Sequence, residues 1–119
     1  MVVAASSLAL AAIEVFVHLN RAHAGIRWVM FEIGIPDSAA VEVLAAARLL
    51  HGWRSEPPAA STVRIGAEWL RADRSQVLRV PSAIIPAESN LLLNSLHADF
   101  RKLRRGKARP FEFDSRLWK

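Results

Sequence analysis

The sequence predicts an α/β domain in which helices pack against one mixed sheet. Three observations lead to this prediction. Segments with the pattern of strands alternate with segments of helical spacing, in the order β-α-β-α-α-β-α-β. The length of 119 residues fits one domain, and 52% apolar and 23% charged residues are typical of a globular protein. There is no cysteine, which excludes disulfide scaffolds, thiolate zinc sites and cysteine nucleophiles.

A short strand and a helix are expected first. Met1–Ala4 is apolar and predicts a strand. Ser6 or Ser7 can then cap a helix, because a serine oxygen accepts a free backbone N–H at a helix start. This helix is expected to run to about Ala24 and to stop at Gly25. Its buried stripe is Leu8, Ala12, Val15 and Leu19, and its polar stripe is Glu14, His18 and Arg21.

A second strand and a second helix follow. Ile26–Ile35 is mostly apolar on both faces, which predicts a central strand rather than an edge strand. Gly34 and Pro36 end this strand. Asp37 or Ser38 then caps a helix over Ala39–Leu50.

The second half begins with a proline-containing loop, His51–Ala60. Thr62–Arg71 predicts a third helix, and Gln76–Val80 predicts a strand that ends at Pro81, because proline has no N–H to extend a ladder. Asn90–Leu96 is expected to form one or two helical turns. Phe111 and Phe113 suggest a last strand.

The net charge of +5 belongs to the C-terminal end of the chain. Residues 101–119 hold eight of the 16 Lys and Arg residues but two of the 11 Asp and Glu residues. A basic run such as 101–109 is usually a solvated loop, and a phosphate-binding patch is the alternative. No stretch has the roughly 18 uninterrupted apolar residues of a membrane helix. Met1–Ile13 has no basic flank, so we interpret it as part of an amphipathic helix and not as a signal peptide.

The polar residues alone give weak indications of a site. Glu14 and His18 have the spacing of two metal ligands on a helix, but no third ligand follows, so no metal is expected. Ser82 lacks the Gly-x-Ser-x-Gly elbow of a hydrolase. The scattered glycines form no phosphate-binding loop. Ser82, Asn90 and Asn94 gather hydrogen-bonding groups after Pro81, and turn chemistry explains such a group as well as a site does.

Five segments in order along the chain nevertheless share features with one family. They are Ser7–Leu19, Ile65–Leu70, Leu78–Ala83, Asn90–His97 and Phe111–Leu117. They resemble, in turn, the glutamate helix, the Ile-Gly-x-x-Trp segment, the Val-Pro-Ser strand, the Asn-Tyr-Leu-x-Asn-Pro-x-His stretch and the closing Phe-x-Phe-Asp-x-Arg-Leu of the RES-domain family. The resemblance covers nearly the whole chain.

The resemblance implies a fold like that of ADP-ribosyltransferases and a toxin of a type II toxin–antitoxin system. Such a toxin attacks NAD, either by hydrolysis or phosphorolysis or by transfer of ADP-ribose to a protein. NAD is then a substrate, and no prosthetic group is implied. The implied partner is an Xre-type antitoxin that blocks the active site. A cytoplasmic protein that has no membrane association and can self-associate is expected.

The family is named for an arginine, a glutamate and a serine, and the resemblance assigns the last two to Glu14 and Ser82. Asn90 and Asn94 match residues beside the serine and are candidates for NAD binding together with Ser82. The family's arginine and its site tyrosine lie upstream of the glutamate helix, and this chain has no arginine before Arg21. Residues 1–119 are therefore expected to form the C-terminal part of a RES domain.

The chemistry of these residues is consistent. Cleavage of the nicotinamide–ribose bond builds positive charge on the sugar, which a carboxylate such as Glu14 stabilises. Nicotinamide leaves as a neutral molecule, so one carboxylate suffices. Ser82 would hold the nicotinamide riboside by hydrogen bonding. Two alternatives stay open: an inert remnant that only binds an antitoxin or NAD, and a nucleic-acid binder that uses residues 101–109.

Overall fold

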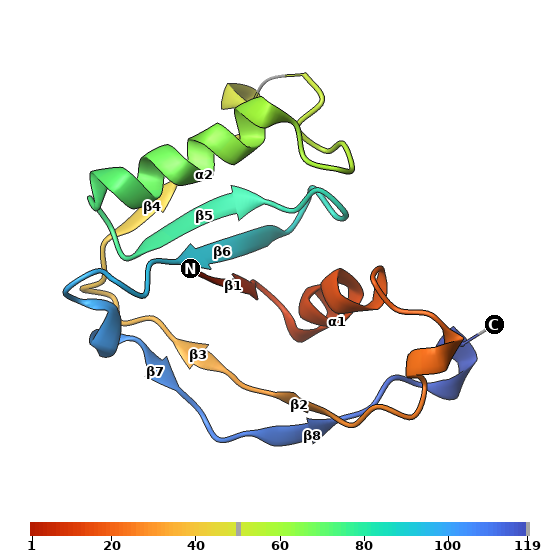
Figure 1. Ribbon diagram of the computed structural model, residues 1–119. Coiled ribbons are helices and arrows are strands. Elements are labelled where there is room, and N and C mark those ends of the chain that lie inside the picture. Colours follow the sequence, from red (N-terminus) through yellow and green to blue (C-terminus); the bar gives the residue numbers. More distant parts are fainter. Residues whose placement is uncertain (50, 119) are drawn as a thin grey trace.

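A four-stranded mixed sheet forms the centre of the chain (Figure 1). The computed structural model describes residues 1–49 and 51–118. The strand order is β1 (Val2–Ala5), β6 (Ser89–Leu93), β5 (Val77–Pro81) and β4 (Val41–Val43). β6 pairs antiparallel with both β1 and β5, whereas β4 pairs parallel with β5. The sequence-based prediction of an α/β fold with a mixed sheet is confirmed.

Two short ribbons run below the sheet in Figure 1. In the first, β2 (Trp28–Met30) pairs antiparallel with β8 (Arg109–Phe111). In the second, β3 (Ile33–Gly34) pairs antiparallel with β7 (Arg104–Arg105). Four short 3₁₀ helices complete the described chain: Arg21–His23, Ala46–Arg48, Phe100–Lys102 and Ser115–Leu117.

Two α-helices lie on either side of the sheet strands in Figure 1, with α2 beside β4 and β5 and α1 beyond β1. α1 spans Leu8–Phe16, and Ser7 caps it by accepting the backbone N–H of Leu10 at 3.1 Å. This agrees with the predicted serine cap. α2 spans Ala60–Ala72 and ends at Asp73, whose φ of 53° is left-handed.

Two groups of apolar residues pack together, and the second contains one buried residue, Phe113. Val77, Leu91 and Leu93 form the core of the sheet, where Ile33, Ile35, Phe100 and Leu103 pack against them. The second group is aromatic and joins the end of α1 to the β2–β8 ribbon and the C-terminal end. Its members are Phe16, Trp28, Phe111, Phe113 and Trp118, with ring centroids 4.9–6.2 Å apart.

The first helix is shorter than predicted. α1 stops at Phe16, and Arg21–His23 forms a separate 3₁₀ turn capped by Asn20. The turn is closed on both sides, because the Asn20 side chain accepts the N–H of Ala22 and His23 Nδ1 accepts the N–H of Asn20. The predicted polar stripe is therefore wrong beyond Glu14, since His18 lies after the helix.

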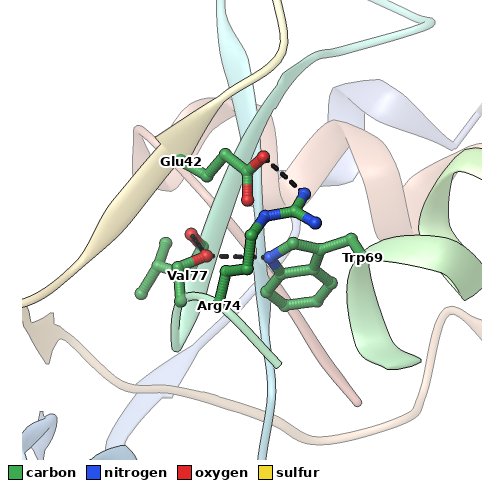
Figure 2. Close-up of polar contacts among 5 residues, drawn as sticks. Glu42, Trp69, Arg74 and Val77 are labelled. Atoms are coloured by element: carbon green, nitrogen blue, oxygen red, sulfur yellow. Dashed lines mark hydrogen bonds and ion pairs between the residues drawn. The ribbon is translucent and has the colours of Figure 1, made fainter. Parts of the chain in front are cut away.

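The predicted helix Ala39–Leu50 is also wrong, although its last residue, Leu50, lies outside the described residues. β4 occupies its first part because its backbone pairs with β5. The buried side chain of Gln76 accepts the N–H of Ala40, and the Glu42 carboxylate lies 2.8 Å from Arg74 (Figure 2). These long-range partners outweigh the helical propensity of the alanines.

Three further elements differ from prediction. Asn90–Leu96 was expected to be helical, but Ser89–Leu93 is a strand in the middle of the sheet. Ile26–Ile35 was expected to be one central strand, but it divides into β2 and β3. The expected last strand includes Phe111 in β8, whereas Phe113 is buried beyond the strand end.

Among the described residues, no helix is both long enough and apolar enough to cross a membrane.

Candidate active site

Glu14 projects from α1 toward the turn that joins β5 and β6. We call this turn, residues 82–88, the Ser82 turn. Ser82 Oγ donates a hydrogen bond to Glu14 Oε1 at 2.8 Å, although the two residues are 68 positions apart. The two residues that the resemblance assigns to one site are therefore in direct contact. Glu14 is half-buried and Ser82 is fully buried.

The hydroxyl of Ser82 forms three hydrogen bonds within the protein. Besides its donation to Glu14, it accepts the backbone N–H groups of Ile84 and Ile85, each at 3.1 Å. A serine hydroxyl has one proton and two lone pairs, so this capacity is filled. Because the N–H groups of Ile84 and Ile85 occupy both lone pairs, the hydroxyl proton of Ser82 points at Glu14. A direct contact of Ser82 with NAD would require one of these bonds to break.

Hydrogen bonds fix the Ser82 turn at its two ends and at Ala83. The N–H of Ser82 donates to the carbonyl of Glu88 at 2.9 Å, and the Glu88 side chain accepts a hydrogen bond from Ser7 Oγ at 2.6 Å. Arg54 Nε donates to the carbonyl of Ala83 at 2.7 Å. The sequence indicated Ser7 only as a cap and did not indicate Arg54. No local pattern could pair Ser7 with Glu88, because they are 81 residues apart.

The two asparagines predicted to bind NAD lie at different ends of β6. Asn90 is opposite Val80, near the Ser82 turn, and its Nδ2 donates to the carbonyl of Ala4 at 3.3 Å. Asn94 is buried and donates to Asp73 Oδ1 at 3.0 Å, beyond the C-terminal end of α2. Its backbone N–H donates to Gln76, six residues before Ser82, or about 20 Å along an extended strand. The structure therefore does not bring Asn94 to the Glu14–Ser82 pair.

A cleft of about 720 Å³ lies on another face of α1. Its walls come from β1, α1 and the β2–β8 ribbon, and most of its lining is apolar, including Val3, Leu8, Ala12, Val29 and Phe111. The basic side chains Lys107 and Arg109 also line it. Glu14 and Ser82 are not among its lining residues, so the apolar cleft and the polar pair are separate features on two faces of one helix.

No group of three or more His, Asp or Glu residues in the described part of the chain could hold a metal ion. The Glu14 carboxylate instead has a serine as its partner. A carboxylate held this way keeps its second oxygen for a ligand and can stabilise positive charge that develops beside it. The arrangement suits electrostatic stabilisation of a cationic transition state.

The fold and this glutamate–serine pair agree with one family. The family model described as the RES domain matches residues 2–114, and the chain belongs to the RES-domain family. Its similarity extends to proteins that carry toxin names.

Three relatives align with nearly all of this chain and with 74% of their own length. The "Prs ADP-ribosylating toxin" of Sphingobium sp. (strain YBL2) is 38% identical over 119 residues. A "Toxin Res" of Yersinia enterocolitica is 40% identical over 114 residues, and a "Toxin Res" of Photorhabdus laumondii is 36% identical over 116 residues. The relatives support the general class of toxin.

Proposed function

We propose that this protein is a toxin that breaks the nicotinamide–ribose bond of NAD and transfers ADP-ribose, with Glu14 as the catalytic carboxylate. The observation that carries the proposal is the 2.8 Å hydrogen bond between Ser82 and Glu14. It joins the two residues that match the family's glutamate and serine. The name of the Sphingobium relative supports ADP-ribose transfer to a protein as the form of the reaction.

Glu14 acts on the ribose carbon that loses nicotinamide. As the bond breaks, positive charge develops on this carbon and the ring oxygen, and the Glu14 carboxylate stabilises it. The electrons of the broken bond stay on the nicotinamide nitrogen, so nicotinamide leaves neutral and needs no proton. An acceptor then attacks the same carbon. Ser82 fixes the orientation of the Glu14 carboxylate, because its hydroxyl donates to Glu14 while it accepts two backbone N–H groups.

The rest of NAD binds beside the Ser82 turn. Arg54 is anchored there through its Nε, which leaves its other guanidinium N–H groups available for phosphate oxygens. Asn90 lies at the same end of the sheet. NAD is the substrate, and the reaction needs no prosthetic group. An Xre-type antitoxin is the proposed protein partner, in line with the toxin names of the relatives.

The purified chain incubated with NAD labelled in its adenylate group tests the proposal. The reactions contain NAD alone, NAD with inorganic phosphate, or NAD with the protein Prs, which the name of the Sphingobium relative gives as its target. Transfer predicts label on Prs, whereas hydrolysis and phosphorolysis leave it on free ADP-ribose or its phosphate. NAD that stays intact under all three conditions contradicts the proposal.

A further inference from the structure

Two serine–carboxylate hydrogen bonds join α1 to the Ser82 turn, and they run in opposite directions. In one, the turn donates to the helix: Ser82 Oγ donates to Glu14 Oε1 at 2.8 Å. In the other, the helix donates to the turn: Ser7 Oγ donates to Glu88 Oε1 at 2.6 Å. The sequence indicated Ser7 only as a helix cap, and it did not indicate a role for Glu88.

Both bonds join α1 to the same turn, Ser7 from the N-cap and Glu14 from inside the helix. Glu14 lies about two helical turns after the cap, so the two contacts are about 10 Å apart along the axis. The turn ends are tied together as well, because the N–H of Ser82 donates to the carbonyl of Glu88. Two separated contacts fix both the tilt and the axial position of α1 against the turn, which one contact alone cannot do.

We propose that Ser7 and Glu88 are positioning residues for catalysis: their hydrogen bond sets where α1 presents the Glu14 carboxylate. This rests on the proposed function, in which Glu14 stabilises charge on the ribose. If the bond is lost, the Ser82–Glu14 contact alone holds α1 against the turn, so the tilt of α1 changes and the carboxylate takes a different orientation relative to bound NAD. Misplacement of a reacting group by about 1 Å can reduce a rate a hundredfold.

Substitution of Ser7→Asp separates this role from helix capping. Aspartate caps a helix as well as serine does, but it cannot donate a proton to Glu88 and it places a second carboxylate beside it. Nicotinamide release should show a fall in kcat of at least about tenfold, with KM changed by less than about threefold. A kcat within threefold of wild type would overturn the proposal.

The double variant Ser7→Asp with Glu88→Gln provides the rescue. The glutamine amide can donate to Asp at position 7, which restores a hydrogen bond of reversed direction, so kcat should return to within about threefold of wild type. Glu88→Gln alone keeps an acceptor for Ser7 and should also stay near wild type. Ser38→Asp, in an exposed turn, controls for added charge. A kcat that the double variant does not restore would also overturn the proposal.

If the wild-type chain releases no nicotinamide, that result contradicts the proposed function. The positioning role of Ser7 and Glu88 is then tested by a second measurement. Urea unfolding is then compared for Glu14→Ala, for Glu88→Ala and for the variant that carries both of these alanine substitutions. Two contacts that jointly position α1 predict coupling of more than about twofold in the unfolding equilibrium constant. Effects that are additive within twofold would show that the contacts act independently and would overturn the positioning role.

Discussion

At Ser82, one buried oxygen takes part in three hydrogen bonds, and this explains why a serine is needed there. The backbone N–H groups of Ile84 and Ile85 occupy its lone pairs, and Glu14 receives its proton. Alanine at this position would leave two partly buried N–H groups without their acceptor, and an unsatisfied buried group costs about 1–3 kcal/mol. The same change would free the Glu14 carboxylate to rotate.

Ser82→Ala should therefore reduce both stability and activity. We expect the free energy of unfolding in urea to fall by about 1–3 kcal/mol, because the partly buried N–H groups of Ile84 and Ile85 lose their acceptor. Ser115→Ala, at an exposed position, should change it by less than about 0.5 kcal/mol. An unchanged stability of Ser82→Ala would mean that water or a backbone shift satisfies Ile84 and Ile85.

Single residues were predicted from the sequence where a short pattern marked them and were missed where their partners are distant. Glu14 and Ser82 each lie in a recognisable segment, and their proximity could be stated in advance. The Ser7–Glu88 bond could not, because Glu88 lies outside the five segments of the resemblance and is 81 positions from Ser7. The prediction that Asn94 binds NAD rests on its segment alone, and that segment does not reveal that its amide bonds Asp73 and the N–H of Leu96.

At the scale of elements, local propensity failed where pairing between distant strands decides the structure. Residues 39–49 have the composition of a helix, yet β4 forms because β5 offers a backbone ladder and Gln76 accepts an N–H from Ala40. β6 is apolar enough for helix or strand, and its two strand neighbours determine the outcome. α2, by contrast, has a strong amphipathic pattern, and it was predicted within two residues of its observed bounds.

The basic segment 101–109 was expected to be a solvated loop, and it is partly a strand. Arg104 and Arg105 form β7 against β3, and the N–H of Gly106 donates to the carbonyl of Glu32 at 2.7 Å. Both arginine side chains are exposed, but the Arg105 guanidinium lies 4.9 Å from the centroid of the Phe31 ring. Backbone pairing holds the segment while its charges stay in water.

Serine substitutions should distinguish the two arginines. Arg105→Ser should lower the free energy of unfolding by about 0.5–1 kcal/mol, because it removes a cation–π contact at an exposed site. Arg104→Ser should change it by less than about 0.5 kcal/mol. Thermal or urea unfolding of the two variants measures the difference. Equal effects would show that the contact of Arg105 with Phe31 does not contribute to stability. A loss of several kcal/mol would show that the arginine side chain makes further packing contacts.

At the scale of the whole molecule, the described chain is more open than a domain of its mass usually is. Its accessible surface is 8569 Å² and its radius of gyration is 15.5 Å. A compact monomer of 13.2 kDa would have about 6,400 Å² and about 13.5 Å. Part of the additional accessible surface lies in the cleft beside α1, where Val3 and Val29 are 61% and 60% exposed. Exposed apolar surface of this kind favours association.

The chain should therefore associate in solution. Sedimentation at tens of micromolar, the order at which such association appears, should show dimers or larger species. The double variant Val3→Lys with Val29→Lys should shift the distribution toward monomer, because it places charge on the cleft walls. Arg21→Glu, at an exposed position of a 3₁₀ turn, serves as the charge control. A monomer with cooperative unfolding would contradict this expectation.

The catalytic role of Glu14 is tested by measuring nicotinamide release from NAD by wild type, Glu14→Gln and Glu68→Gln. The two substitutions remove the same charge, one from the carboxylate bound to Ser82 and one from an exposed position on α2. Glu14→Gln should lower the rate at least about a hundredfold, because it removes the group that stabilises positive charge on the ribose. Glu68→Gln should keep the wild-type rate. Equal rates for wild type and Glu14→Gln would show that another group stabilises the charge on the ribose and that Glu14 is not the catalytic carboxylate.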